Sequence, residues 1–203
     1  YFKSAHYADE AIGVLVDELD KAGLLDNTIL VIYGDHDAKL PKKDYVRLYN
    51  YDTKTDSVLS KDDPKYSEVD YFRYELERKV PFIIWSKNDK FKKEIKTAMG
   101  MYDAMPTLGN MLGFKPKYAL GNDIMNLSDN VVVFPNGNWV SNNIYYNSQK
   151  DQYKVLNTDY IVNNNEITKN NEYVSKRLEI SNDIILYDLI KNENSRLERV
   201  EGE

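Results

Sequence analysis

The chain has 203 residues, 42% of them hydrophobic and 30% charged, a composition typical of a packed globular protein rather than a disordered one. With 33 acidic and 27 basic residues the net charge is −6, which argues against binding of duplex nucleic acid, because that requires a concentrated basic surface. The absence of cysteine excludes disulfides, cysteine-ligated zinc and a thiol nucleophile. No apolar run approaches the roughly 20 residues needed to cross a bilayer.

Apolar residues at the start of the chain recur with the spacing of an amphipathic helix. Gly23 is expected to end this helix, whose apolar face consists of Ala5, Ala8, Ile12, Leu15 and Leu19. His6 is expected to be a packed or capping residue rather than a metal ligand. Because the sequence starts inside a helix, without an initiator methionine or a signal peptide, we expect it to be a fragment of a longer protein.

A buried strand is predicted after the first helix. Residues 28–33 form a continuous β-branched and apolar run that ends at Gly34. A run that is apolar on both faces is typical of a central strand in a parallel sheet. Because a helix, a tight turn and a buried strand make half of a βαβ unit, the predicted fold class is α/β.

Residues 41–79 are polar, charged and rich in tyrosine, and we expect a long excursion with short helices around 45–49 and 68–77. A second strand is predicted at 80–85, where Pro81 indicates an edge strand or the first residues of a strand. A further helix is predicted at 102–112, with Pro106 in its first turn and Gly113 at its end.

The pattern changes near residue 128. Short apolar runs separated by Asn, Gly, Ser and Asp predict antiparallel strands around 131–134, 138–140, 144–146 and 153–156, and Trp139 is expected to line a groove or to fill the interface between two sheets. A terminal helix is predicted at 172–191, with core contacts from Ile180, Ile184, Leu186 and Leu189. The predicted organisation is an α/β core part at residues 1–127 and a small antiparallel β subdomain with a terminal helix at 128–203.

Asp35 and His36 are the main candidates for chemistry. They come directly after the buried strand, and α/β folds bind ligands at the carboxyl ends of their strands. A carboxylate oxygen and an imidazole nitrogen suit Mn²⁺ or Zn²⁺ better than Ca²⁺. Two ligands do not complete a metal site, and the alternative is that these polar residues only cap the next helix.

Several motifs in order along the chain resemble the sulfatase and alkaline-phosphatase superfamily. They are YADEAIG at 7–13, GLLDNT at 23–28 leading into Gly34-Asp35-His36, VPFII at 80–84 and DAMPTL at 103–108. FPNGNWV at 134–140 is similar to a segment of the lipoteichoic acid synthase branch. The motifs cover roughly residues 1–147. The fold that this resemblance implies is the C-terminal part of a sulfatase-like α/β sandwich, with a small antiparallel sheet and a C-terminal helix.

The resemblance implies a metal-dependent enzyme. In this family an Asp-His pair in this context binds the catalytic divalent metal, so Asp35 and His36 are the implied ligands. Mn²⁺ is the expected metal, with Zn²⁺, Mg²⁺ or Ca²⁺ as alternatives. The remaining ligands and the nucleophile, a Thr that attacks a phosphodiester, are expected in the N-terminal half of the domain, outside this sequence. The chain alone is therefore expected to be inactive.

The sequence departs from the family pattern after His36. Lipoteichoic acid synthases usually continue through Tyr or Gly, with a substrate-contacting Ser a few residues later. Here the run is Asp37-Ala38-Lys39-Leu40-Pro41, and Leu40 in place of that Ser puts glycerol-phosphate in doubt as the substrate. Lys39 is a candidate phosphate contact instead. The alternative is that Lys39, Lys42 and Lys43 form an ordinary solvated basic loop.

The implied function is that of an extracellular enzyme at the bacterial cell membrane, acting on a small-molecule or lipid-linked phosphate or sulfate ester as a phosphoglycerol transferase does. A sulfatase (a sulfuric ester hydrolase) or a phosphodiesterase of the same superfamily is one alternative, and a non-catalytic envelope module is another. Membrane association through the absent N-terminal region is implied by resemblance alone. Without the other half of its domain, the chain is expected to expose apolar strand edges.

Overall fold

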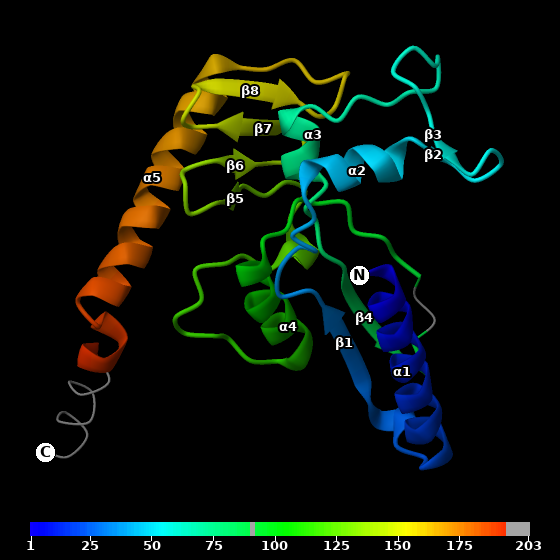
Figure 1. The fold of residues 1–203 in the computed structure, drawn as a ribbon. Coiled ribbons are helices and arrows are strands. Elements are labelled where there is room, and N and C mark those ends of the chain that lie inside the picture. The colour runs from blue at the N-terminus through cyan, green and yellow to red at the C-terminus, as the bar shows by residue number, and fades with distance from the viewer. Residues whose placement is uncertain (90–91, 194–203) are drawn as a thin grey trace, which may run out of the picture. The chain divides into compact units, whose positions relative to one another are not determined.

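The chain folds into two compact units, residues 1–93 and 94–203. The computed structural model describes residues 1–89 and 92–193 (Figure 1). It has mixed α/β architecture with small antiparallel sheets and a C-terminal helix, which confirms the predicted fold class. The predicted division between residues 127 and 128 was based on a change in sequence pattern, whereas the two units are defined by their internal contacts. The division at 127 and 128 stays a prediction.

The first unit begins with helix α1 (Phe2–Lys21), followed by a short 3₁₀ turn η1 (Leu25–Asn27). Gly23 adopts a left-handed φ of +69° just beyond the helix, as predicted for the residue that ends it. The predicted amphipathic helix is present, but no residue of α1 is buried within the described residues. His6 is likewise not packed, because its side chain is 74% exposed. Helical spacing predicts an apolar face but does not supply the surface that covers it.

Strand β1 (Ile29–Tyr33) pairs with strand β4 (Phe82–Ser86). The pairing is antiparallel and runs from Ile29 opposite Ser86 to Tyr33 opposite Phe82. The prediction of a buried central strand in a parallel sheet is therefore wrong for the described residues. A run that is apolar on both faces indicates burial, whereas strand direction depends on a partner strand that is remote in sequence. Pro81 immediately precedes β4, as predicted for the start of a strand, and its carbonyl oxygen accepts a 3.2 Å hydrogen bond from the Gly34 amide.

The excursion between these strands contains α2 (Lys42–Tyr49), β2 (Tyr51–Asp52), β3 (Ser57–Val58) and α3 (Tyr71–Leu76). Both helices overlap the predicted ranges. The buried side chain of Asn50 donates hydrogen bonds to the carbonyl oxygens of Val46 (2.8 Å) and Ser67 (3.0 Å) and accepts one from the Ser67 amide (2.6 Å). One amide side chain thus ties the end of α2 to the segment before α3.

The second unit begins with η2 (Met101–Asp103) and α4 (Ala104–Leu112), followed by η3 (Ile124–Asn126). Pro106 lies in the first turn of α4, where a backbone N–H has no helical partner, and Gly113 ends the helix with a φ of +78°. The carboxyl group of Asp103 is fully buried. It accepts hydrogen bonds from the amides of Gly100 (2.8 Å) and Asn122 (2.7 Å) and from Asn130 Nδ2 (2.9 Å).

The predicted antiparallel strands are present as a four-stranded sheet with sequential order. Its strands are β5 (Val132–Val133), β6 (Trp139–Val140), β7 (Ile144–Asn147) and β8 (Gln152–Val155). Gly137, in the turn between β5 and β6, has a φ of +84°, which favours glycine because it has no Cβ.

Helix α5 (Asn164–Leu186) packs against this sheet and completes the core of the unit (Figure 1). Trp139 is fully buried, stacks on Tyr146 with ring centroids 5.5 Å apart, and donates a 2.8 Å hydrogen bond from Nε1 to Asn171 Oδ1 of α5. Trp139 therefore fills an interface between a sheet and a helix, not one between two sheets.

Helix α5 starts at Asn164, earlier than predicted, because Asn163 caps it by accepting a hydrogen bond from the Asn165 amide. Its buried contact is Val174, with Ile167 and Leu178 partly buried beside it. The predicted contacts Ile180, Leu186 and Leu189 are 37%, 72% and 43% exposed, so that part of the prediction is wrong. The apolar face that packs on the sheet lies about two turns closer to the N-terminus of the helix.

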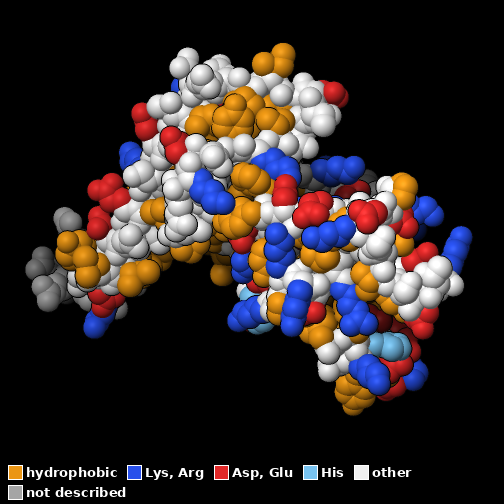
Figure 2. All heavy atoms as spheres, turned by 45° about the horizontal axis from the view of Figure 1, so that its top comes forward, with side chains coloured by type: hydrophobic (Ala, Val, Ile, Leu, Met, Phe, Trp, Pro, Cys, Tyr) orange, Lys and Arg blue, Asp and Glu red, His pale blue; other side chains and the backbone are white. Residues whose placement is uncertain are grey.

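The visible face in Figure 2 mixes Lys and Arg with Asp and Glu, and hydrophobic side chains are exposed among them. The expected apolar exposure is found on the β1–β4 ribbon, where Ile29, Tyr33, Ile83 and Trp85 are each more than 40% exposed. Within the described residues this ribbon has two strands only, so each strand keeps one unpaired edge. No helix among the described residues has the length and apolar character to span a membrane.

We predict that Asp103→Ala destabilises the protein by about 2–4 kcal/mol, because the buried amides of Gly100 and Asn122 lose their charged acceptor. Urea unfolding measures the loss. Asp159→Ala, at an exposed aspartate of the same unit, should leave the unfolding midpoint almost unchanged. Equal midpoints for the two variants would contradict the role of Asp103.

We predict that Trp139→Phe costs about 1–3 kcal/mol, because the smaller ring leaves a cavity and leaves Asn171 Oδ1 without its donor. Trp85 is 41% exposed and provides the matched control, since Trp85→Phe should change stability by no more than about 0.5 kcal/mol. Denaturant titration of both variants checks this, and a Trp85→Phe variant as unstable as Trp139→Phe would refute it.

Candidate metal site

The candidate ligands lie on a short loop that follows β1. The chain leaves the strand at Gly34, where a Cβ would lie 2.8 Å from Val80 Cβ. Glycine is therefore required for the end of β1 to approach the residue that precedes Pro81 and β4. This close approach fixes where the loop begins.

Asp35 and His36 are brought together at the surface. Asp35 Oδ1 lies 3.7 Å from His36 Nε2, and the two side chains are 85% and 55% exposed. His36 Nδ1 is 2.7 Å from the carbonyl oxygen of Asp37. A carbonyl oxygen can only accept, so Nδ1 is the donor of this bond, and Nε2 is the ring nitrogen that can supply a lone pair to a ligand. The pair thus offers one carboxylate and one imidazole nitrogen to a common ligand.

Lys39 lies three residues beyond His36, with an exposed side chain and a backbone φ of +51°. This left-handed conformation is uncommon outside glycine and asparagine. The Lys39 amide donates a 3.0 Å hydrogen bond to Asp37 Oδ2, which holds the turn closed. The structure describes no partner for the Lys39 ammonium group among residues 1–89 and 92–193.

Asp37 and Arg78 belong to the same loop region, and sequence reasoning did not find them. Arg78 Nε donates to Asp37 Oδ2 and Arg78 Nη2 donates to Asp37 Oδ1, each at 3.2 Å. The hydrogen bonds from Arg78 lower the pKa of the Asp37 carboxyl group, and the same contact raises the pKa of Arg78. The residues are 41 positions apart. Asp37 follows β1 and Arg78 precedes β4, so the two could have been paired from the sequence only if the β1–β4 pairing were known.

The described residues contain no group of three or more His, Cys, Asp and Glu side chains arranged to hold a metal ion. Asp35 and His36 therefore form a partial site at most. Ligand bonds of about 2.1 Å place neighbouring donor atoms roughly 3–3.5 Å apart, so the 3.7 Å separation fits a shared cation after a small side-chain movement. Complete coordination requires donors from elsewhere.

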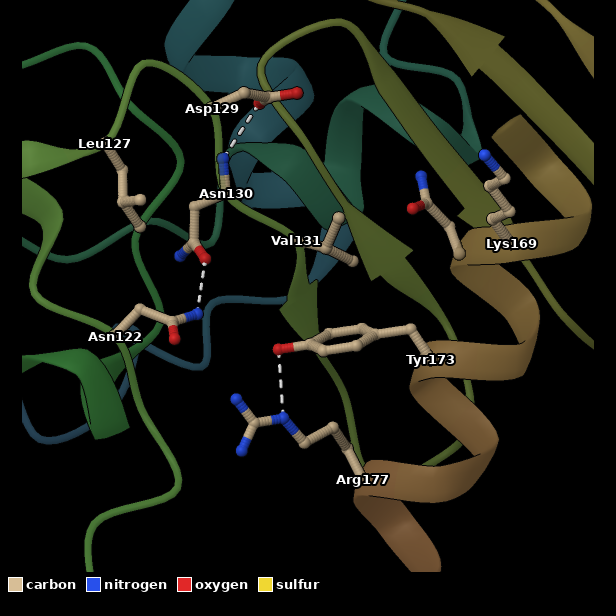
Figure 3. Close-up of a pocket in the computed structure, with 9 residues that line it drawn as sticks. Asn122, Leu127, Asp129, Asn130, Val131, Lys169, Tyr173 and Arg177 are labelled. Atoms are coloured by element: carbon tan, nitrogen blue, oxygen red, sulfur yellow. Dashed lines mark hydrogen bonds between the residues drawn. The ribbon is translucent and has the colours of Figure 1, made fainter. Parts of the chain in front are cut away.

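A hollow of about 470 Å³ lies in the second unit, between α5 and the segment that precedes β5 (Figure 3). Tyr173 and Arg177 project from α5, and Arg177 Nε donates a 2.9 Å hydrogen bond to Tyr173 Oη. Across the hollow, Asn122 Nδ2 donates to Asn130 Oδ1 at 2.9 Å. The lining has a single carboxylate, Asp129, and no histidine. Its donor set does not suit a transition metal, so Asp35 and His36 remain the metal candidates.

The chain is similar in sequence to one protein family and to several curated proteins. The Sulfatase family model matches residues 1–114. Lipoteichoic acid synthase 2 of Bacillus subtilis (strain 168) is 34% identical over 195 residues, and lipoteichoic acid synthase 1 of the same strain is 30% identical over 194 residues. The lipoteichoic acid synthase of Staphylococcus aureus (strain USA300) is 28% identical over 195 residues.

Each of these alignments covers 94% of the chain but only 28% of the relative. The chain thus spans little more than a quarter of the length of the curated relatives that it matches. The similarity runs from the first unit through most of the second, beyond the end of the family model at residue 114. The chain belongs to the sulfatase family of the alkaline-phosphatase superfamily, and it is similar to lipoteichoic acid synthases.

Proposed function

We propose that the intact protein is a metal-dependent phosphoglycerol transferase that acts on phosphodiester substrates of the bacterial cell envelope. The observation that carries this proposal is the similarity to lipoteichoic acid synthases over 94% of the chain, which includes the Asp35-His36 loop. The family alone allows several ester-cleaving activities. The extent of similarity to one named activity favours the transferase.

In this proposal Asp35 and His36 hold part of the coordination shell of a divalent cation. The support is geometric, because the two donor atoms are close together on exposed side chains, and no further partner of these two atoms is found among residues 1–89 and 92–193. Mn²⁺ is the proposed metal, since it accepts mixed oxygen and nitrogen ligands, with Zn²⁺, Mg²⁺ and Ca²⁺ as alternatives. A bound divalent cation would polarise phosphoryl oxygens and lower the pKa of a coordinated hydroxyl.

In this proposal Lys39 binds the substrate phosphate and Asp37 orients His36. The Lys39 ammonium group contacts a non-bridging phosphate oxygen as a point charge. The backbone carbonyl oxygen of Asp37 keeps the proton of His36 on Nδ1, so that Nε2 stays free to bind. We expect the nucleophile and the remaining metal ligands to come from parts of the intact protein outside this sequence, so the chain alone would be inactive.

The proposed setting is the outer face of the bacterial cell membrane, with a lipid-linked phosphate ester as substrate. A membrane attachment would come from another part of the protein. The acidic net charge of −6 fits a small anionic substrate held by local cations better than a nucleic acid.

Sulfuric ester hydrolysis is the second candidate, since residues 1–114 match the family model named for sulfatases. Phosphodiester hydrolysis is an alternative on the same ground, the match to this family model. These activities differ from the transferase in the acceptor or in the ester, and parallel assays with phosphodiester and sulfate monoester substrates separate them. A non-catalytic envelope module is the third candidate, and the metal measurement below tests it.

We predict that Asp35→Ala/His36→Ala weakens Mn²⁺ binding to the intact protein by at least about 100-fold, because two ligands are lost together. Isothermal titration calorimetry measures the affinity, and transferase activity should fall with it. Sulfate monoester cleavage that exceeds phosphodiester turnover would favour the sulfatase instead.

The chain offers a closely matched control for this experiment. His6 and Glu10 are also an exposed histidine and carboxylate, with Nε2 and Oε1 3.8 Å apart. His6→Ala/Glu10→Ala should leave Mn²⁺ affinity unchanged. If the Asp35 and His36 variant also binds Mn²⁺ as the unmodified protein does, the metal site is wrong and the non-catalytic module gains support.

We predict that Lys39→Gln raises the KM for a phosphodiester substrate about 3- to 10-fold, with Mn²⁺ affinity unchanged, because one exposed charge-assisted contact is lost. Glutamine leaves the side-chain length similar and does not change the backbone requirement at φ +51°. Lys42→Gln, at the start of α2, is the control and should leave KM unchanged. Equal effects of the two substitutions would support a general basic loop.

A further inference from the structure

An ion pair joins the loop that carries Asp35 and His36 to a distant part of the chain. Arg78 lies between α3 and β4, and its guanidinium group meets both oxygens of the Asp37 carboxylate at 3.2 Å. A planar fork of this kind constrains orientation as well as distance, which a single contact to a lysine does not. Arg78 Nη1 also lies 3.6 Å from Glu75 Oε1, so α3 holds the guanidinium group from its other side.

Asp37 transmits this constraint through both its side chain and its backbone. Besides the two bonds from Arg78, its Oδ2 accepts the 3.0 Å bond from the Lys39 amide. Its carbonyl oxygen accepts the 2.7 Å bond from His36 Nδ1. Asp37 is therefore the one residue of the loop that contacts the imidazole ring, the following turn and the segment before β4.

The two aspartates of the loop differ sharply in exposure. The Asp35 side chain is 85% exposed, whereas the Asp37 side chain is 11% exposed and turned toward Arg78. Exposed ion pairs usually contribute little to stability. A bidentate contact to a largely buried carboxylate, as here, does fix the position of the two side chains.

We propose that Asp37 and Arg78 are positioning residues for the candidate ligands Asp35 and His36. They fix the orientation and the tautomer of His36 without contacting the metal themselves. The inference rests on the proposed function, since it assumes that Asp35 and His36 bind a metal. Because Arg78 binds the Asp37 carboxylate, the backbone of Asp37 is held in a fixed position. Its carbonyl oxygen therefore stays within hydrogen-bond distance of His36 Nδ1 and keeps the proton on that nitrogen.

The pair also controls charge near the candidate ligands. Asp37 is two residues from Asp35, and a free carboxylate there would compete with Asp35 and His36 for a cation. Arg78 neutralises that carboxylate and occupies both of its oxygens. The loop thus presents one carboxylate to a metal instead of two, which favours a mixed oxygen and nitrogen site over an oxygen-only site of the kind that Ca²⁺ prefers.

A purely structural role is the competing explanation, because the pair also joins the ends of the β1–β4 ribbon. The ribbon carries a matched contact at its other end, where Lys87 forms ion pairs with Asp20 and with Asp26, the latter at 2.9 Å. Lys87 follows β4 directly and lies far along the strand from the loop. Substitution of Lys87 therefore removes both of these ion pairs from the same ribbon and leaves the contacts of His36 in place.

The test compares Arg78→Gln, Arg78→Lys and Lys87→Gln in the intact protein. Calorimetry gives the Mn²⁺ affinity, and ¹⁵N NMR of the metal-free protein reports which nitrogen of His36 carries the proton. Arg78→Gln should weaken Mn²⁺ binding about 10- to 100-fold and raise the fraction of His36 protonated at Nε2. Arg78→Lys should recover part of the affinity, since it restores the charge without the fork. Lys87→Gln should leave both readouts unchanged.

The outcomes separate this inference from the function on which it rests. If Arg78→Gln binds Mn²⁺ normally and keeps the His36 tautomer, while Asp35→Ala/His36→Ala abolishes binding, the positioning role is overturned and the metal site stands. If Lys87→Gln weakens Mn²⁺ binding as much as Arg78→Gln does, the pair is only a structural contact and the inference fails. If Asp35→Ala/His36→Ala has no effect on Mn²⁺ binding, the proposed function itself is wrong.

Discussion

The antiparallel pairing of β1 with β4 is the constraint on which the arrangement of the first unit depends. It joins residues 29–33 to residues 82–86 in a fixed register, and that register places the loop after β1 next to the segment before β4. Gly34 permits the close approach, since any larger residue would meet Val80. The Asp37–Arg78 contact and the orientation of His36 follow from this placement. A shift of two residues in the register would move Arg78 by about 7 Å along the strand direction and separate the pair.

Buried polar side chains organise the irregular parts of both units. Asn50 ties the end of α2 to the approach to α3, and Asp103 gathers the backbone amides of Gly100 and Asn122. A chain with long irregular connections must satisfy many backbone groups without helix or sheet partners, and a fully bonded carboxyl or amide group does this at several points at once. These residues therefore act as the fixed points of segments in which apolar burial is limited.

Local signals in the sequence were sufficient for most helices and strands of the second unit. The turn at Gly137, the end of α4 at Gly113 and the four short strands follow from turn chemistry and alternation, which are properties of neighbouring residues. Strand direction, the buried face of α5 and the exposure of α1 were not predictable, because each depends on a partner remote in sequence. The site divides in the same way. Asp35 and His36 are adjacent and were found by motif, whereas the partner of Asp37 lies 41 residues away.

The left-handed backbone at Lys39 has a consequence for how this loop can vary among related proteins. Lys39 has a backbone φ of +51°, a conformation that glycine or asparagine adopts more readily than lysine does. One substitution to asparagine would therefore remove the positive charge while keeping the loop shape and the Asp37 contact. A β-branched residue would disturb the loop itself. Variation at this position can therefore change the charge of the loop without changing the path of its backbone.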